Sequence, residues 1–374
     1  MSDSEDIPES DRVKGAPHPR KTEMLFGQGE AVASFLEAYN QKRLHHSWLI
    51  TGPKGIGKAT LAWNIARFLL ASDGSAGMID GPVADNLHIP HDNPVFRRAA
   101  SLAEPGIFLC RRPWDEKKKR LKTAITVEEV RKLKSFFTLS SADGGWRIAI
   151  VDAADEMNTS AENALLKVLE EPPAKTIILL ISHHPAKLLP TIRSRCRELR
   201  CNTLAADDLG KAVEQAGFTD ENRDALNTLS GGSAGESIDL IANDGLEIYQ
   251  NIIALLATAP RINRPRIIAL GEKCVGKGSE DRYDMTVRLL LLALSRLALN
   301  GAKGNARHLI DGEAVLAARL SSNPYQAREW ATLVQELASR ITHARAVNLD
   351  PAQVILDTFL SIDATAGRAS LLSA

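Results

Sequence analysis

The sequence has few aromatic residues and no excess of charge of either sign. Aromatic side chains make up 5% of the 374 residues, so a platform for stacking nucleic-acid bases is not expected. Lysine plus arginine and aspartate plus glutamate both number 46, so no overall field draws the chain to nucleic acid. Any contact with DNA must therefore come from a local cluster of charge or from partner chains.

Cysteine, signal sequences and long apolar runs are also scarce. The four cysteines form no C-x-x-C pair, and this usage suits a reducing cytoplasm. No stretch resembles a signal peptide. The most apolar window, residues 287–299, is broken by Arg288 and Arg296, which predicts a buried helix and not a membrane span. Its leucines are expected to fill a helical core: Leu289, Leu290, Leu292, Leu294, Leu297 and Leu299.

The order of patterns predicts an α/β region followed by helices. Apolar runs at 47–50, 146–152 and 176–182 alternate with helical patterns, which is typical of a parallel sheet. The capping box Thr159-Ser160-Ala161-Glu162 predicts the start of one helix. From residue 204 the pattern is helical throughout. The expected parts are a disordered tail at 1–22, an α/β core at 23–202, a helical lid at 203–245 and a helical domain at 246–374.

The most informative motif lies between the first predicted strand and its helix. It consists of Gly52, Pro53, Lys54, Gly55, Ile56, Gly57, Lys58, Ala59 and Thr60. Glycines let backbone N–H groups turn toward an anion, and the helix start and Lys58 add positive charge. This indicates a P-loop for the phosphates of ATP or ADP, the alternative being a glycine-rich turn without a ligand.

The metal site of this P-loop is altered. Ala59 stands where a Ser or Thr hydroxyl would hold Mg²⁺, and Thr60 would face another side of the helix. Asp152 ends a predicted strand and is placed to hold a metal ion, although a carboxylate that caps the next loop is the alternative. The relevant ATPases commonly carry Glu directly after this acid, whereas this chain has Ala153. We therefore expect Mg²⁺ binding to be poor and hydrolysis to be weak or absent.

Two further segments carry a family resemblance. The run from Asn163 to Pro173, followed by Ile192-Arg193-Ser194-Arg195-Cys196, resembles the clamp-loader branch of the AAA+ proteins in bacterial DNA polymerase III. Similar pieces lie at 45–50, 125–131 and 151–155, and the resemblance covers about residues 25–202 well. It implies an AAA+ core, a lid and a helical collar that joins a hetero-oligomeric ring.

The resemblance also implies roles for single residues. Arg195 would project across a subunit interface toward ATP bound by a neighbour, with support from Arg193. A structural arginine that pairs with Glu198 or a helix C-terminus is the alternative. Gly235 falls where active relatives carry an arginine that senses the γ-phosphate. The resemblance thus implies a non-motor subunit that works with gamma/tau-like and delta-like subunits, a sliding clamp and primed DNA, and with no membrane.

Two other functions stay open. One is an active ATPase motor of the same family, against which Ala153 and Gly235 argue. The other is a DNA-binding adaptor that uses the basic cluster at 111–122, for which a solvated loop is the preferred interpretation. No segment resembles a polymerase or exonuclease site. Family members often carry a four-cysteine zinc module, but residues 71–110 offer only Cys110, His88 and His91, so zinc is not expected.

Overall fold

The computed structural model of the chain describes residues 8–72, 83–138, 145–219, 222–276, 278–304 and 309–371. These residues form two compact units. The first comprises the chain up to Thr219 together with Gly232–Ile238, and the second comprises Asp220–Gly231 and the chain from Asp239 onward. The segment predicted as a lid, 203–245, is therefore divided between the two units.

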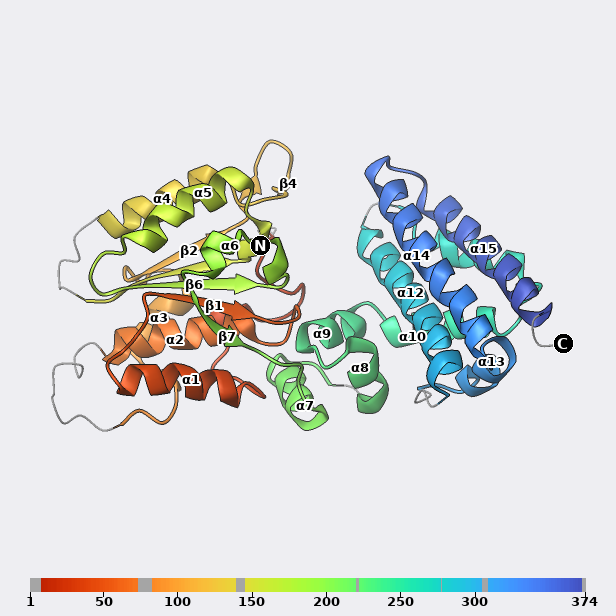
Figure 1. Cartoon of the computed structure of the whole chain (residues 1–374), viewed down its shortest axis with the longest axis horizontal. Helices are drawn as coiled ribbons and strands as arrows, with labels where there is room; N and C mark the ends of the chain where they lie inside the picture. The colour runs from red at the N-terminus through yellow and green to blue at the C-terminus, as the bar shows by residue number, and fades with distance from the viewer. Residues whose placement is uncertain are drawn as a thin grey trace, which may run out of the picture. The chain divides into compact units, whose positions relative to one another are not determined.

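A five-stranded parallel sheet forms the centre of the first unit (Figure 1). The strand order is β2-β5-β6-β1-β7, so the strand before the P-loop lies between two strands that come much later in the sequence. The strands are β1 (Ser47–Thr51), β2 (Ile107–Arg111), β5 (Arg147–Asp152), β6 (Thr176–Ser182) and β7 (Arg197–Arg200). The predicted α/β core with a parallel sheet is confirmed, although the sequence did not reveal β2 and β7.

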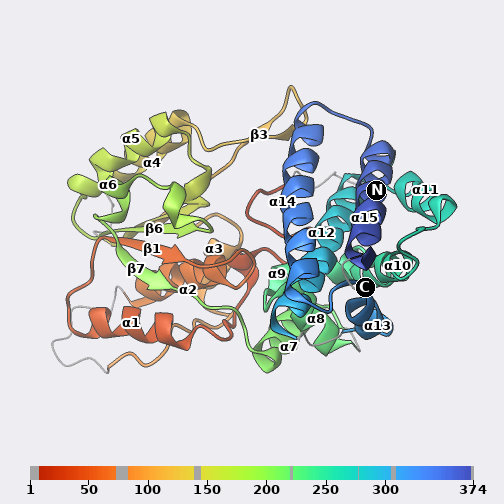
Figure 2. The same cartoon turned by 45° about the vertical axis from the view of Figure 1, so that its right-hand side comes forward.

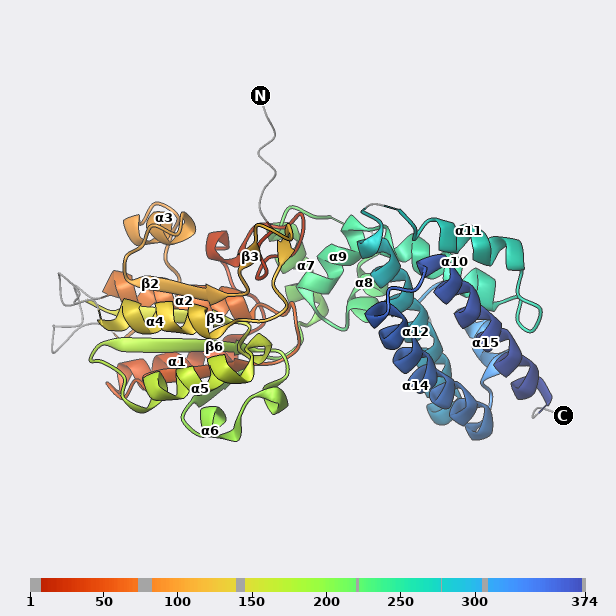
Figure 3. The ribbon, with the colours of Figure 1, turned by 90° about the horizontal axis from the view of Figure 1, so that it is seen from above.

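Helices cover both faces of this sheet, which explains why its central strands are continuous apolar runs. Trp48 and Ile50 of β1 pack with the helices on one face, while Leu49 joins the core on the other face. Figures 1 and 3 show α4 and α5 over one face and α1 and α2 over the other. The helices of this unit are α1 (Gly29–Asn40), α2 (Lys58–Ser72), α3 (Pro94–Ala100), α4 (Val127–Thr138), α5 (Thr159–Glu170), α6 (Pro190–Arg193) and α7 (Ala206–Gln215), with 3₁₀ turns η1 (Pro19–Lys21), η2 (Ala154–Glu156) and η3 (Pro185–Lys187).

The start of α5 differs from the prediction by one residue. Asn158 is the N-cap, and its side chain accepts a hydrogen bond of 2.9 Å from the N–H of Ala161. Thr159, the first residue of the predicted capping box, is instead the first helical residue. Glu162 does not close a capping box but accepts a bond of 3.4 Å from the N–H of Leu189. Asparagine and threonine are both good caps, so the sequence pattern alone could not choose between them.

The segment before residue 22 is not a free tail where it is described. Arg111 at the end of β2 binds Glu9 at 2.9 Å and also pairs with Asp11. Asp11 lies 2.9 Å from His18 Nε2, and both side chains are 1% exposed. The prediction of disorder is therefore wrong for residues 8–21, because ion pairs to the core replace the apolar burial that the composition lacks.

A small antiparallel hairpin follows β2. It joins β3 (Trp114–Asp115) to β4 (Arg120–Leu121), with Trp114 opposite Leu121. Figures 1 and 2 show that the hairpin stands clear of the five-stranded sheet. The predicted basic cluster therefore lies on a folded element.

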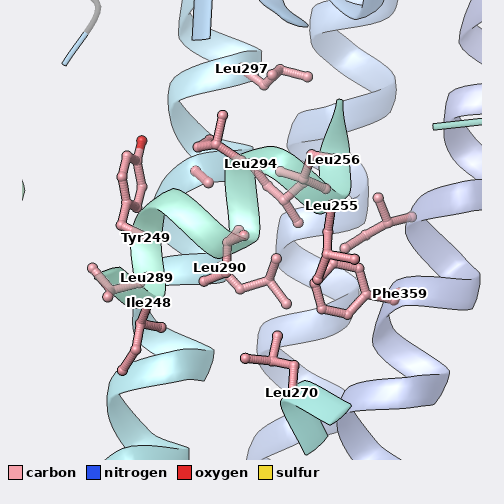
Figure 4. Close-up of a cluster of buried hydrophobic side chains, with 14 of the residues drawn as sticks. Ile248, Tyr249, Leu255, Leu256, Leu270, Leu289, Leu290, Leu294, Leu297 and Phe359 are labelled. Carbon is pink, nitrogen blue, oxygen red and sulfur yellow. The ribbon is translucent and has the colours of Figure 1, made fainter. Parts of the chain in front are cut away.

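The second unit is helical, as predicted. Its helices, together with α9, which crosses from the first unit, are α8 (Arg223–Ser230), α9 (Ala234–Ala242), α10 (Gly245–Leu256), α11 (Arg264–Glu272), α12 (Glu280–Lys303), α13 (Glu313–Leu320), α14 (Pro324–Ala346) and α15 (Pro351–Leu371). Leu255 and Leu256 of α10 and Phe359 of α15 meet the leucines of α12 in one core (Figure 4).

Helix α12 is the one described helix with the length and apolar composition of a membrane span. Leu289, Leu290, Leu294 and Leu297 are buried in the core of the second unit, which confirms the predicted core helix. Leu292 is partly buried against the same core. Leu299 is 50% exposed, so the prediction was wrong for this leucine.

Candidate functional site

The P-loop joins β1 to α2 through backbone that requires glycine. Gly52, Gly55 and Gly57 have φ of 137°, 76° and 98°, which side chains of L-residues rarely allow. A Cβ at Gly52 would overlap the carbonyl oxygen of Cys201, just beyond β7. The predicted strand, loop and helix context of the motif is therefore present.

The P-loop offers backbone N–H groups without acceptors, and the buried ammonium group of Lys58 lies beside them. In the described chain, the N–H groups of Lys54, Gly55 and Gly57 donate to no acceptor. Lys58 is 3% exposed, and its Nζ donates to the carbonyl oxygens of Gly52 at 2.7 Å and of Pro53. Burial lowers the pKa of Lys58 to about 8. Free amides beside a poorly solvated ammonium group fit a phosphate group.

Gln28, which the sequence analysis missed, ties the P-loop to the end of β7. Its side-chain nitrogen donates to Ile56 O at 2.9 Å and to Asn202 O at 2.8 Å, and its oxygen accepts from Asn202 N at 3.0 Å. Gln28 is 4% exposed. No local pattern marks this glutamine, because its partners come from two distant segments.

The start of α9 packs directly on the P-loop. Ser233 Oγ donates to Lys54 O at 2.9 Å, and Gly235 N donates to Gly55 O at 2.9 Å. A Cβ at Gly235 would lie 2.9 Å from Gly55 Cα and 3.4 Å from Val13. The backbone of Gly55 thus occupies the space that a side chain at position 235 would need.

Asp152 lies at the end of β5, at the same edge of the sheet as the P-loop. Its residue is 7% exposed, and burial together with the charge of Asp11 raises its pKa to about 8, against the opposing effect of Lys58. The next acids are engaged elsewhere: Asp155 accepts from His183 N at 2.8 Å, and Glu156 pairs with Arg112 at 2.7 Å. Neither acid therefore takes the place of a Glu at position 153.

The donor set fits a phosphate better than a magnesium ion. Mg²⁺ requires oxygen ligands, and Ala59 offers none at the start of α2. Asp152 is then the only carboxylate of the predicted metal set. The P-loop amides and Lys58 would hold phosphate oxygens by hydrogen bonds and charge, and the metal would lack its usual hydroxyl.

His183 follows β6 beside this site and was also missed. Its buried Nδ1 has no hydrogen-bond partner among the described residues. Burial and the charge of Lys58 lower its pKa to about 4. The only available signal was its place directly after a buried strand, at the edge where parallel strands end.

Arg195 lies at the opposite edge of the sheet. β1 and β7 run parallel, with Trp48 opposite Arg197 and Thr51 opposite Arg200. Arg195 therefore precedes the strands, whereas the P-loop follows them, and the strand residues between them span roughly 13 Å. The side chain of Arg195 is too short to cover this distance and therefore cannot reach the P-loop of its own chain.

The Arg195 guanidinium is accessible and weakly held. It is 37% exposed, pairs with Glu170 at 2.9 Å and donates to Thr191 O at 3.0 Å. Glu170 is itself 48% exposed, so the pair is largely solvated and contributes little stability. The sequence analysis gave two structural partners for Arg195, a helix C-terminus and Glu198. The contact with a helix carbonyl, Thr191 O, is present. Glu198 does not pair with Arg195 but accepts a hydrogen bond of 2.6 Å from the Thr51 hydroxyl.

Residues 27–205 match a family model described as DNA polymerase III, delta subunit. The matched range contains both the P-loop and Arg195 and spans a little less than half of the chain. The chain is 36% identical over 191 residues to the DNA polymerase III subunit delta' of Pseudomonas aeruginosa, which covers 50% of this chain and 53% of that protein. It is 28% identical over 227 residues to subunit delta' of Escherichia coli K12, and this match covers 59% of this chain and 61% of that protein. The matched segments thus span little more than half of these relatives.

Other matches include proteins named subunit gamma. The chain is 24% identical over 253 residues to the DNA polymerase III subunit gamma of Buchnera aphidicola, which covers 66% of this chain and 64% of that protein. Among solved structures, a gamma subunit-related protein of Thermotoga maritima matches with 16% identity and a TM-score of 0.40, covering 89% of this chain and 99% of that one. This structural similarity is too low to support an inference about function.

The cysteine and histidine positions considered for zinc are used otherwise. Cys110 is a buried free thiol in β2, and burial raises its pKa to about 12. His88 and His91 both face Glu23, at 3.3 Å and 2.9 Å. The described residues contain no cluster of three or more side chains that could hold a metal ion.

Proposed function

We propose that the chain is a non-motor, delta-prime-like subunit of a replicative clamp loader that presents Arg195 to the ATP site of a neighbouring subunit. The relatives named subunit delta' and subunit gamma support membership of such an assembly. The observation that carries the role of Arg195 is its position, exposed at the edge of the sheet opposite the chain's own P-loop. From there the guanidinium is out of reach of the chain's own P-loop and is open to a second molecule.

The chemistry of guanidinium suits this task. Its charge is permanent, and its planar fork of donors matches the oxygens of a phosphoryl group. At the neighbour's site it would neutralise negative charge that develops as the γ-phosphoryl group is transferred. The half-exposed pair with Glu170 would be exchanged for the phosphate, because a largely solvated ion pair is weak.

The chain's own site is proposed to bind the phosphates of ATP or ADP without efficient hydrolysis. The unused amides of the P-loop and buried Lys58 support phosphate binding. Ala59 and Ala153 remove a metal ligand and the residue that would activate water, and Gly235 removes a cation. In this proposal the chain acts within the ring that places a sliding clamp on primed DNA.

Mutation of Arg195 in the reconstituted complex tests the proposal. Removing an arginine finger lowers turnover at the affected site by about 10³-fold or more, so Arg195→Ala should abolish that site's share of ATP hydrolysis while the ring still assembles. Arg195→Lys should restore little of this ATP hydrolysis, because the ammonium group of lysine lacks the planar fork of N–H donors. Lys187→Ala, at an exposed lysine after β6, is the matched control. Unchanged hydrolysis in Arg195→Ala would contradict the proposal.

An active ATPase motor of the same family is the competing function. Steady-state hydrolysis by the purified chain distinguishes the two, since a motor should turn over ATP through its own P-loop. Turnover that Lys58→Ala abolishes would favour the motor over the non-motor subunit.

A further inference from the structure

The tip of the β3–β4 hairpin concentrates positive charge on the surface. Residues 116–120 and Lys122 are exposed, and they comprise five cations beside the single anion Glu116. In the described part of the chain, Lys117, Lys118, Lys119 and Arg120 form no ion pair. Because the whole chain has equal numbers of positive and negative side chains, this local excess is set apart from the average surface.

The base of the hairpin is held firmly, so its tip is displayed in a defined place. Arg111 binds Glu9 and Asp11, and Arg112 binds Glu156 at 2.7 Å. These two arginines, which the sequence grouped with the basic cluster, are therefore occupied. Lys122 N donates to Pro113 O at 2.9 Å and closes the base of the hairpin.

The tip itself is ordered by a carboxylate and carries a strained lysine. Asp115 Oδ1 accepts hydrogen bonds of 3.1 Å from the N–H groups of Lys117 and Lys118. Lys119 has φ of 46°, in the left-handed region that glycine and asparagine tolerate best. A lysine at this position keeps a charge at the turn where local geometry favours a smaller residue.

We propose that the hairpin 114–122 binds the phosphate backbone of duplex DNA. Lysine and arginine side chains bind phosphates without reading sequence, and this electrostatic contribution dominates non-specific binding. The exposed tip offers no aromatic side chain to stack on bases and no apolar side chain for a peptide interface. The inference rests on the proposed function for the presence of DNA beside the chain.

The test compares two variants of the full-length chain, each with four cations neutralised. The hairpin variant combines Lys117→Gln, Lys118→Gln, Lys119→Asn and Arg120→Gln. The control variant combines Lys42→Asn, Arg43→Gln, Lys134→Gln and Lys211→Gln, at scattered exposed positions of the first unit. Lys42 has φ of 57° and so matches Lys119 in backbone conformation. Fluorescence anisotropy with a labelled primed duplex measures affinity from about 50 to about 300 mM salt, the range over which phosphate contacts weaken.

The hairpin variant should bind the duplex at least about tenfold more weakly at low salt, with a slope of log affinity against log salt shallower by about 3 to 4. The control variant should stay within about threefold of the natural chain. If the natural chain does not bind duplex at the lowest salt concentration, or if both variants bind equally, the proposal is wrong. Tighter binding to a polyglutamate peptide than to duplex would also overturn it in favour of an acidic protein partner.

The outcome can be separated from that of the proposed function. Arg195→Ala should keep the DNA affinity of the natural chain. The hairpin variant should keep ring assembly and ATP hydrolysis in the absence of DNA. Unchanged ATP hydrolysis in Arg195→Ala would therefore contradict the proposed function alone, and unchanged duplex affinity in the hairpin variant would contradict this inference alone.

Discussion

The N–H group of Gly235 donates a 2.9 Å hydrogen bond to the carbonyl oxygen of Gly55 in the P-loop. The bond brings the start of α9 so close to the loop that no side chain fits at either glycine. Gly55 and Gly235 are distant in the sequence, but a side chain at either position would collide with the backbone of the other. The packing of the site therefore leaves no room at position 235 for the arginine that the resemblance places there in active relatives.

Introducing an arginine at position 235 should not produce ATP hydrolysis by the chain's own site. Gly235→Arg places a Cβ 2.9 Å from Gly55 Cα, so α9 must shift away from the P-loop. Overpacking of this kind lowers the free energy of unfolding by about 1–3 kcal/mol. Urea denaturation and steady-state ATP turnover measure the two effects.

Gly29→Arg is the control for this substitution. Gly29 is exposed at the start of α1, and a Cβ added there would meet no atom within 4 Å. The free energy of unfolding of this variant should stay within about 0.5 kcal/mol of that of the natural chain. A stable Gly235→Arg variant that hydrolyses ATP would contradict the packing argument.

The buried carboxyl of Asp152 should make stability depend on pH. Burial and the charge of Asp11 raise its pKa from 3.8 to about 8, so the folded chain holds a proton that the unfolded chain releases. The contribution of this group is therefore full below about pH 4 and is lost as the pH rises to about 8. Each tenfold change in proton affinity corresponds to about 1.4 kcal/mol.

Asp152→Asn should remove this dependence. Between about pH 5 and about pH 8, the unfolding free energy of the variant relative to the natural chain should rise by more than about 1.4 kcal/mol. Urea denaturation at the two pH values measures the difference. Parallel pH profiles for the two proteins would show that the carboxyl is ionised in the fold.

Continuous apolar runs made the central strands predictable, and the glycines of the P-loop made the candidate phosphate site predictable. β7 could not be found, because only Leu199 of its four residues is buried and its length is too short for a pattern. The contacts of Gln28 and Ser233 with the P-loop were equally hidden. Ser233 and Lys54 are 179 residues apart, and only the folded chain brings them together.

The composition of the segment before residue 22 also failed to predict its structure. Its polar sequence predicted disorder, yet Glu9, Asp11 and His18 form a network with Arg111 in which the Asp11 and His18 side chains are buried. Ion pairs at such distances in sequence leave no periodic signal. Arg195 was found only through its resemblance to a family triplet, and its partner Glu170 was not among the expected ones.

Arg111→Met should release the N-terminal segment. Asp11 is 1% exposed, and removing one partner of a buried pair costs about 3–5 kcal/mol. Trypsin should then cut faster after Arg12 and Lys14, as measured by mass spectrometry of the digest. Arg112→Met is the control, because Arg112 pairs with Glu156 and not with this segment. Equal cleavage in the two variants would contradict the anchoring role.

Acid should release the same segment in the natural chain. Burial favours the neutral form of Asp11, but hydrogen bonds and charges from His18 and Arg111 outweigh it and lower the pKa of this carboxyl. The stabilisation is therefore present above the ordinary pKa of 3.8 and is lost as the pH falls through the lowered value. Hydrogen exchange of residues 9–18 should accelerate there in the natural chain, and Arg111→Met should show fast exchange already at neutral pH.

Glu313 should be the most sensitive polar residue of the second unit. Its side chain is 7% exposed and accepts hydrogen bonds from Tyr249, from Arg296 at 3.3 Å and from Leu309 N at 2.6 Å. Glu313→Ala removes the buried carboxylate that pairs with the partly buried Arg296 and that accepts from Tyr249 and Leu309, which lowers the free energy of unfolding by about 3–5 kcal/mol. Tyr249→Phe removes only one hydroxyl from the same network and should cost about 1 kcal/mol. Hydrogen exchange in α10 and α12 measures both effects, and equal changes in the two variants would show that the carboxylate is not the centre of the network.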